Sequence, residues 1–180
     1  EFQRARNECL MELLYASGMR ISELMSLPVS TARGRPKMIL IKGKGSKERI
    51  VPVSPPALDA LDRWLKLRDK KEDLSIKAGF KRSNFLFPSN SKNGHLTRNW
   101  FFNKIKSWAI EAGVRSENVS PHTIRHAFAT HLLSNGADLR VIQTILGHSD
   151  IATTEIYTHI VNDKLKSTLE EHHPLSTKSK

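Results

Sequence analysis

The chain has 180 residues, a length typical of one domain with a sizeable hydrophobic core. Its hydrophobic share of 38% and charged share of 26% are those of an ordinary soluble globular protein, and no apolar run approaches the ~20 residues that span a bilayer. A formal net charge of +11 favours a polyanionic partner, because each lysine or arginine that meets a phosphate releases a condensed counterion. Charge alone leaves ribosome-associated and membrane-associated proteins as alternatives.

The cysteine content and the first residues of the chain indicate where in the cell the protein is expected and whether the sequence is part of a longer one. Cys9 is the only cysteine, so no internal disulfide is possible and a reducing, cytoplasmic location is expected. No secretory signal opens the sequence. Because residue 1 is Glu rather than Met, we expect the sequence to begin partway through a longer protein.

The first third of the chain predicts helices followed by a β-hairpin. Residues 5–18 place leucines on one helical face and end at a glycine suited to a C-terminal cap, and a short second helix follows directly. Residues 38–41 and 50–53 have the apolar pattern of strands. The basic, glycine-broken stretch 42–49 between them predicts the turn of the hairpin.

The middle of the chain alternates between helical and polar segments. Residues 56–68 return to helical periodicity, whereas the charged residues 70–84 are expected to form a surface loop. Residues 85–87 predict a short strand, and the composition of residues 89–94 is that of a loop.

Capping signals delimit the helices of the last third. Thr97 is a suitable N-cap for a helix that ends near Gly113, and Ser120-Pro121 opens a helix that Gly136 closes. Asp138 caps another helix that ends at Gly147, and two short helices are expected over residues 151–157 and 163–171. The predicted fold class is therefore α+β, mostly α-helical, with one small antiparallel sheet.

The helix opened by Ser120 carries the first group of residues suited to chemistry. His122 and Arg125 are three positions apart and share a face near the N-terminus, where free N–H groups and the helix dipole favour an anion. A capped amphipathic helix with a polar solvent face is the alternative. His122 and His126 have the spacing of a helical zinc pair, but no glutamate follows His122, so no metal or other cofactor is predicted.

A second group follows in Leu146-Gly147-His148-Ser149, nine residues before Tyr157. Only two tyrosines are present, and Tyr15 lies in the apolar first helix, so a nucleophilic tyrosine would have to be Tyr157. An ordinary half-buried tyrosine is the alternative interpretation.

Two further groups lie near the N-terminus. Arg20 follows a helix-ending glycine, and Glu23 lies one helical turn later, within reach to orient the guanidinium. An exposed ion pair of small energetic value is the alternative. Residues 33–49 carry seven basic residues against one acidic, which suits contact with a nucleic-acid backbone or a solvated turn.

Taken in order, these motifs resemble the catalytic domain of the tyrosine recombinases, also called the lambda-integrase family. The matching segments are Gly-Met-Arg20-Ile-Ser-Glu-Leu, Gly-Lys44-Gly-Ser-Lys-Glu-Arg, Pro-His122-Thr-Ile-Arg125-His, Leu-Gly-His148-Ser and Ile-Tyr157-Thr-His. The resemblance covers essentially the whole chain, residues 1–180, and residues 125–133 and the ending near His172-His173-Pro174 look particularly like the bacterial Xer recombinases.

The resemblance implies a role for each matching residue. Tyr157 would attack a DNA phosphodiester and form a 3′-phosphotyrosyl link, without metal or ATP. Arg20, Arg125 and His148 would hold the nonbridging oxygens, and His122 would accept the tyrosine proton. Lys44 would protonate the leaving oxygen, Glu23 would hold Arg20, and the predicted DNA contacts on the hairpin are Lys42, Lys47 and Arg49.

The resemblance also implies partners and a biological setting. We expect a double-stranded DNA recombination site, further recombinase subunits in a tetrameric synapse, a septal DNA translocase, and a role in resolving chromosome or plasmid dimers during cell division. Residues 163–180 resemble the helix and tail that dock into a neighbouring subunit, and an N-terminal core-binding domain is expected before this chain. A phage or transposon integrase, a type IB topoisomerase and a non-catalytic DNA-binding relic are the alternatives.

Overall fold

The structure of the protein, a computed structural model, describes residues 1–43 and 48–147. The elements in chain order are α1 (Phe2–Ser17), α2 (Ile21–Met25), η1 (Val29–Ala32), β1 (Met38–Lys42), β2 (Glu48–Pro52), α3 (Pro55–Lys77), α4 (Arg98–Glu111), η3 (Ser116–Asn118), α5 (Pro121–Ser134) and α6 (Leu139–Leu146). Helices dominate and one two-stranded sheet is present in this part of the chain, so the predicted fold class is confirmed. The helices expected over residues 151–157 and 163–171 lie outside the described residues.

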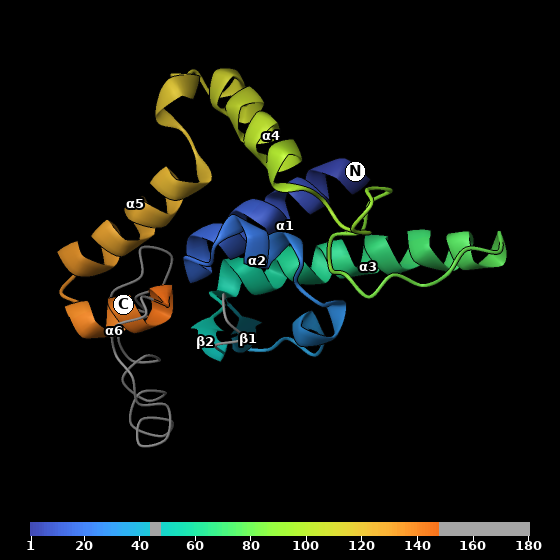
Figure 1. Cartoon of the computed structure of the whole chain (residues 1–180), viewed down its shortest axis with the longest axis horizontal. Coiled ribbons are helices and arrows are strands. Elements are labelled where there is room, and N and C mark those ends of the chain that lie inside the picture. The colour runs from blue at the N-terminus through green and yellow to red at the C-terminus, as the bar shows by residue number, and fades with distance from the viewer. Residues whose placement is uncertain (44–47, 148–180) are drawn as a thin grey trace.

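Helix α1 runs through the centre of the molecule and packs against α3 on one side and α5 on another (Figure 1). Its leucine face is buried as expected, because Leu10, Leu13 and Leu14 are fully inaccessible to solvent. Apolar side chains from the hairpin, α3 and α5 complete one continuous hydrophobic core around it. Burial of this face, more than helix propensity, is what holds a helix of this length in place.

Gly18 ends α1 in the left-handed conformation, with φ of 58°. Its N–H donates to the carbonyl of Leu14 at 3.1 Å, as in a helix C-cap. A Cβ at this position would lie 2.5 Å from the ring of Phe128. Only glycine therefore fits both the conformation and the close approach between the end of α1 and α5.

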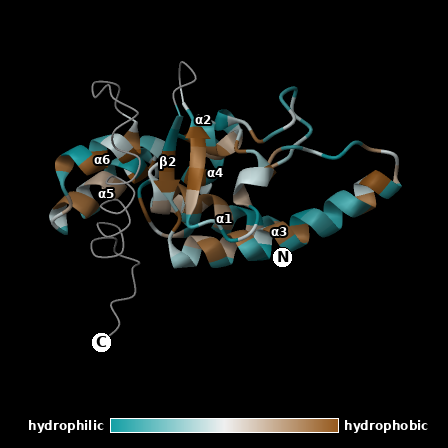
Figure 2. Cartoon of the chain, turned by 90° about the horizontal axis from the view of Figure 1, so that it is seen from below, coloured by the Kyte–Doolittle hydropathy of each residue, from teal (hydrophilic) through white to brown (hydrophobic). Residues whose placement is uncertain are grey.

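The predicted β-hairpin is confirmed. Strands β1 and β2 are antiparallel, with Met38 opposite Pro52 and Lys42 opposite Glu48. In β1, Ile39 and Ile41 face the core while the intervening residue is exposed, which is the alternation of a half-buried strand. Figure 2 shows β2 with both hydrophilic and hydrophobic colouring along its length. The turn residues 44–47 lie outside the described part of the chain.

Helix α3 is longer than predicted, because residues 70–77 continue the helix instead of forming a surface loop. A buried contact within the helix explains the extension: Arg68 donates to Glu72, one turn later, at 2.9 Å. The guanidinium of Arg68 also donates to the carbonyls of Ser83 and Phe85, so it ties the returning chain back to the helix. The polar composition of residues 70–84 indicated an exposed segment and gave no sign of these contacts.

The short strand predicted over residues 85–87 is reduced to isolated bridges, Pro28 with Phe85 and Pro88 with His95. Trp64 fixes this segment, since its indole N–H donates to the carbonyl of Leu86 at 3.0 Å. The capping signals farther along were read correctly: Thr97 accepts from the N–H of Trp100 at the start of α4. Likewise, Asp138 caps α6, and Gly147 ends it with φ of 66°.

Helices α5 and α6 lie together at one end of the molecule, and the C-terminal half of α3 extends toward the other end (Figure 1). The ribbon of that extension is coloured mostly hydrophilic, with a hydrophobic stretch near its end (Figure 2). No helix within residues 1–43 and 48–147 has the length and apolar character to cross a membrane.

Candidate active site

The starts of three helices meet at a small hollow of about 130 Å³. The residues preceding and opening α2 form one wall, and the first turns of α4 and α5 supply the others. The hollow is lined by Met19, Arg20, Ile21, Ser22, Arg98, Pro121, His122 and Arg125. The structure thus brings Arg20 from one sequence motif together with His122 and Arg125 from another.

The start of α5 is fixed by a reciprocal cap. The N–H of Thr123 donates to the hydroxyl of Ser120 at 3.1 Å, and the N–H of Ser120 donates to the hydroxyl of Thr123 at 2.8 Å. This pair satisfies two backbone donors at the helix terminus. Pro121 occupies the first turn and is buried, which leaves His122 exposed at the rim of the hollow and Arg125 one turn deeper.

Arg125 is anchored between two segments far from it in sequence. Its Nη1 donates to the carbonyl of Gly18 at 2.6 Å, and its Nη2 donates to the carbonyl of Leu146. Burial, together with the neighbouring charges of Arg20 and Arg49, lowers the pKa of Arg125 to about 10, while Glu23 opposes the shift. An anion in the hollow would relieve this repulsion, because it favours the charged guanidinium.

Arg20 is the residue that precedes α2, and the contact expected from its spacing to Glu23 is present. Its Nη1 donates to Glu23 Oε1 at 3.2 Å, its backbone N–H donates to Oε2 at 2.7 Å, and its Nη2 donates to the carbonyl of Gly147 at 3.2 Å. Burial opposes ionisation of Glu23, but the hydrogen bonds from Arg49 and Arg20 outweigh it and hold the pKa of its carboxyl below the usual range.

Among the residues that the structure describes, the charge of this cluster is not balanced. Three guanidiniums, those of Arg20, Arg49 and Arg125, act around one carboxylate, that of Glu23. Buried charges without partners are costly, so an excess of positive charge at a hollow is suited to binding an anion. Guanidiniums present paired N–H groups that match the geometry of phosphate oxygens.

The residues predicted on the hairpin differ in their surroundings. Lys42 is 76% exposed, with its ammonium 3.5 Å from Glu48 on the opposite strand. Arg49 is only 10% exposed, and its guanidinium lies against Glu23 instead of facing outward. Lys44 and Lys47 lie in the turn, and His148 and Tyr157 lie beyond residue 147, so all four are outside the described residues.

Arg98 lines the hollow, although the sequence analysis did not single it out. It is the first residue of α4, directly after the N-cap Thr97, and it is exposed. A basic residue at the start of a helix is a sequence signal for anion binding. Nothing in the sequence, however, indicates that the start of α4 lies beside the starts of α2 and α5.

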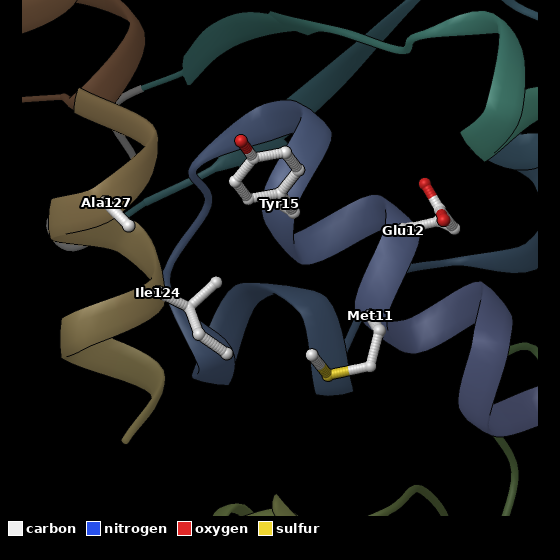
Figure 3. Close-up of a pocket in the computed structure, with 5 residues that line it drawn as sticks. All are labelled: Met11, Glu12, Tyr15, Ile124 and Ala127. Atoms are coloured by element: carbon white, nitrogen blue, oxygen red, sulfur yellow. The ribbon is translucent and has the colours of Figure 1, made fainter. Parts of the chain in front are cut away.

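A larger, apolar hollow of about 310 Å³ lies between α1 and α5 (Figure 3). It is lined by Met11, Glu12, Tyr15, Ile124 and Ala127, so it carries a carboxyl and no cation. The hydroxyl of Tyr15 hydrogen-bonds Nδ1 of His131 at 2.8 Å, and burial raises the pKa of Tyr15. Because the residues that line this hollow include a carboxyl group and no cation, the hollow does not suit a phosphate.

No group of three or more histidine, cysteine, aspartate or glutamate side chains is placed to hold a metal ion within the described part of the chain.

Comparison with protein families shows what class of protein this geometry belongs to. The family model of the phage integrase family matches residues 1–164. The chain therefore belongs to this family, which is that of the tyrosine recombinases, and the resemblance read from its motifs is confirmed.

Among curated proteins, the chain is 49% identical over 171 residues to tyrosine recombinase XerD of Brucella suis biovar 1 (strain 1330). The alignment covers 95% of this chain and 53% of the relative. The chain thus spans about half the length of the curated relatives it matches.

Two solved structures extend the comparison to the fold. The crystal structure of XerA recombinase matches with a TM-score of 0.70 and 32% identity, over 96% of this chain and 60% of that one. A XerH recombinase bound to palindromic difH substrate, in a post-cleavage complex, matches with a TM-score of 0.66 and 31% identity, over 93% of this chain and 46% of that one.

Proposed function

We propose that this protein is a Xer-type site-specific recombinase that cleaves and rejoins double-stranded DNA through a 3′-phosphotyrosyl intermediate. The observation that carries the proposal is the hollow in which Arg20, Arg125 and His122 meet with an excess of positive charge. The similarity to XerD and to a recombinase bound to its DNA substrate supports the same function.

Arg20 and Arg125 bind the nonbridging oxygens of the scissile phosphate in this mechanism. Negative charge accumulates on those oxygens in the pentavalent transition state, where fixed cationic donors contribute most. Both guanidiniums are already held in place by backbone carbonyls and, for Arg20, by Glu23. Prepositioned donors need little reorganisation when the phosphate reacts.

The nucleophile in this proposal is the hydroxyl of Tyr157. A free tyrosine has a pKa of about 10, so it needs a proton acceptor at neutral pH, and His122 takes that role. The Tyr157 oxygen forms a bond to phosphorus, the bond to the 5′-oxygen breaks, and Lys44 gives that oxygen its proton. His148 adds a hydrogen bond to the nonbridging oxygens.

The phosphotyrosyl bond keeps the energy of the bond that it replaces. The 5′-hydroxyl of another strand can therefore attack it and restore a phosphodiester, which is why the chemistry needs neither metal nor ATP. Arg98 at the rim of the hollow, with Lys42 and Lys47 on the hairpin, contacts the flanking DNA backbone in this proposal. Such contacts position the duplex without reading its sequence.

The proposed partners follow from the same chemistry. Exchange between two duplexes requires four cleaved strands, so recombinase subunits act together in a tetramer, with residues 163–180 docking into a neighbour. We also propose an action on chromosome or plasmid dimers, in association with a septal DNA translocase.

The proposal is tested with nicked suicide duplexes that carry Xer-type sites, in EDTA and without added metal. Denaturing gels score covalent protein–DNA adducts for the wild type and for Tyr157→Phe, which lacks only the attacking oxygen. Tyr15→Phe is the matched control, because Tyr15 lies in the other hollow.

We expect an adduct with the wild type and with Tyr15→Phe, and none with Tyr157→Phe. Specific binding of the duplex without any adduct would overturn the catalytic function and leave a DNA-binding module. An adduct that survives in Tyr157→Phe would overturn the assignment of the nucleophile.

A further inference from the structure

We propose that Arg49 is a positioning residue of the active site, which holds Glu23 and the C-terminal end of α6, and through them the guanidinium of Arg20. This inference rests on the proposed function. It assigns Arg49 a different role from the DNA contact predicted from the hairpin sequence. All three nitrogens of its guanidinium donate to these two partners, Glu23 and the end of α6.

Arg49 binds the carboxylate of Glu23 in a two-pronged contact. Nη1 donates to Oε1 at 2.8 Å and Nη2 donates to Oε2 at 2.7 Å, while Nε donates to the carbonyl of Ile145 at 2.9 Å. The side chains of Arg49 and Glu23 are 10% and 6% exposed, so water competes little for these bonds. Short, charge-assisted bonds of this geometry fix orientation as well as distance.

Glu23 passes this orientation to Arg20. The same two carboxylate oxygens that accept from Arg49 also accept from Arg20: Oε1 from Nη1 at 3.2 Å and Oε2 from the backbone N–H at 2.7 Å. The Glu23 carboxylate therefore accepts four bonds, two from each arginine. The position of the Arg20 guanidinium in the hollow therefore depends on Arg49, although Arg49 does not line the hollow.

Arg49 also acts at the end of α6. The last carbonyls of a helix lack partners within it. Here three consecutive carbonyls each accept from an arginine: Ile145 from Arg49, Leu146 from Arg125 and Gly147 from Arg20. The cationic groups also complement the negative end of the helix dipole. One cluster of guanidiniums thus fixes both the phosphate-binding arginines and the backbone that leads into His148.

The approach of Arg49 to Gly147 is close. A Cβ on Gly147 would lie 2.9 Å from Cδ and 3.1 Å from Nε of Arg49. The left-handed backbone of Gly147 also disfavours any side chain. The absence of a side chain at residue 147 therefore lets the Arg49 side chain pass and reach Ile145.

A contact between Arg49 and DNA fits these observations less well. Lys42, on the other strand of the same hairpin, is 76% exposed and available to a phosphate. Arg49 has both Nη atoms on a carboxylate, and turning one toward DNA would break one of its two bonds to the buried Glu23. The geometry favours holding Glu23 over binding the DNA backbone.

The experiment compares the wild type with Arg49→Lys and Arg49→Met on the same nicked suicide duplexes. Lysine keeps the charge but cannot form the two-pronged contact, and methionine keeps much of the stem without the charge. Adduct formation is measured in single turnover at saturating DNA, and DNA affinity is measured separately as a function of salt. Lys42→Met serves as the contrasting variant on the same hairpin.

A structural control separates positioning from general destabilisation. Arg68→Lys removes a comparable buried two-pronged contact, that between Arg68 and Glu72, which does not line the hollow. Thermal unfolding of every variant sets a working temperature at which all are folded. At that temperature, Arg68→Lys is expected to cleave at the wild-type rate.

We expect both Arg49 variants to cleave at least tenfold more slowly at saturating DNA, with DNA affinity and its salt dependence changed less than twofold. Lys42→Met is expected to lose affinity and to lower the slope of log K against log salt by about one. The low-pH limit of cleavage should move to higher pH in Arg49→Met, because Glu23 loses the bonds that keep its pKa low.

Two outcomes would overturn the inference and leave the proposed recombinase function intact. One is cleavage by Arg49→Met at the wild-type rate. The other is a loss of DNA affinity in the Arg49 variants, with a reduced salt slope like that of Lys42→Met. Absence of an adduct with the wild type itself would overturn the proposed function, and the positioning role with it.

Discussion

Two buried arginine clusters in this protein differ in how their charge is balanced. Arg68 on α3 donates to Asp69 and Glu72, both at 2.9 Å, and to two backbone carbonyls, so one guanidinium meets two carboxylates. At the hollow, the guanidiniums of Arg20, Arg49 and Arg125 share the carboxylate of Glu23. The first cluster holds a helix and a returning loop together. Within residues 1–43 and 48–147, the second keeps an excess of positive charge.

The difference indicates which arginines to assign to binding. Two arginines of the basic stretch are already paired with acidic side chains of α3. Arg33 donates to Asp69. Arg35 donates to Asp59 and Asp62. The basic stretch 33–49 is thus partly neutralised by α3. A count of basic residues along the sequence therefore overstates the charge that this stretch offers to DNA.

The strongest test of the balanced cluster is Arg68→Ala. We expect a loss of about 3–5 kcal/mol in the free energy of unfolding, because the carboxylate of Glu72 stays buried without its main partner. Thermal and urea unfolding measure the change. Arg63→Ala, which removes the exposed pair with Glu8, is the control and should cost under about 1 kcal/mol. Equal losses in the two variants would contradict the assigned role of Arg68.

The strongest test of the unbalanced cluster is Arg125→Lys. We expect cleavage to slow by about 10²–10³-fold, because the compact ammonium of lysine cannot bond both backbone carbonyls and still donate a paired contact to the phosphate oxygens. Single-turnover cleavage of nicked duplexes measures the rate. Arg115→Lys, an exposed residue before α5, should leave the rate unchanged. If Arg125→Lys slowed cleavage less than fivefold, Arg125 would not be a phosphate ligand.

A smaller effect is expected at the rim of the hollow. Arg98→Ala should weaken DNA binding at all sequences and lower the slope of log K against log salt by about one, since one phosphate contact is lost. Fluorescence anisotropy over a salt series measures both quantities. Arg82→Ala is the matched control, because Arg82 is paired with Asp73 on α3. Identical slopes for Arg98→Ala and the wild type would remove Arg98 from the interface.

Local rules of sequence predicted much of this fold and, at the candidate site, the contact between Arg20 and Glu23. The caps at Thr97, Ser120 and Asp138 each satisfy backbone donors within three residues, so they could be read without tertiary information. The same holds for the contact of Arg20 with Glu23, three residues later. Spacing on one helix is enough to predict such contacts.

Contacts between segments that are distant in the chain could not be predicted from the sequence. The extension of α3 depends on Arg68 meeting the carbonyls of Ser83 and Phe85, which required knowing that the chain returns there. Arg49 looked like one more basic residue of the turn because its partners are 26 and 96 positions away. Arg98 lines the hollow because the starts of three helices pack together, and no local sequence pattern predicts that packing.

The arginine contacts at the end of α6 also bear on the order of folding. Arg20 bonds to Gly147, 127 positions later in the chain, and Arg49 bonds to Ile145 across 96 positions. Such long loops close late, because their entropy cost precedes the gain from the contacts. A growing polypeptide that ends before residue 145 lacks the acceptors that anchor these guanidiniums. We therefore expect a nascent chain to acquire the anchored positions of Arg20 and Arg49 only after α6 has been synthesised and has packed.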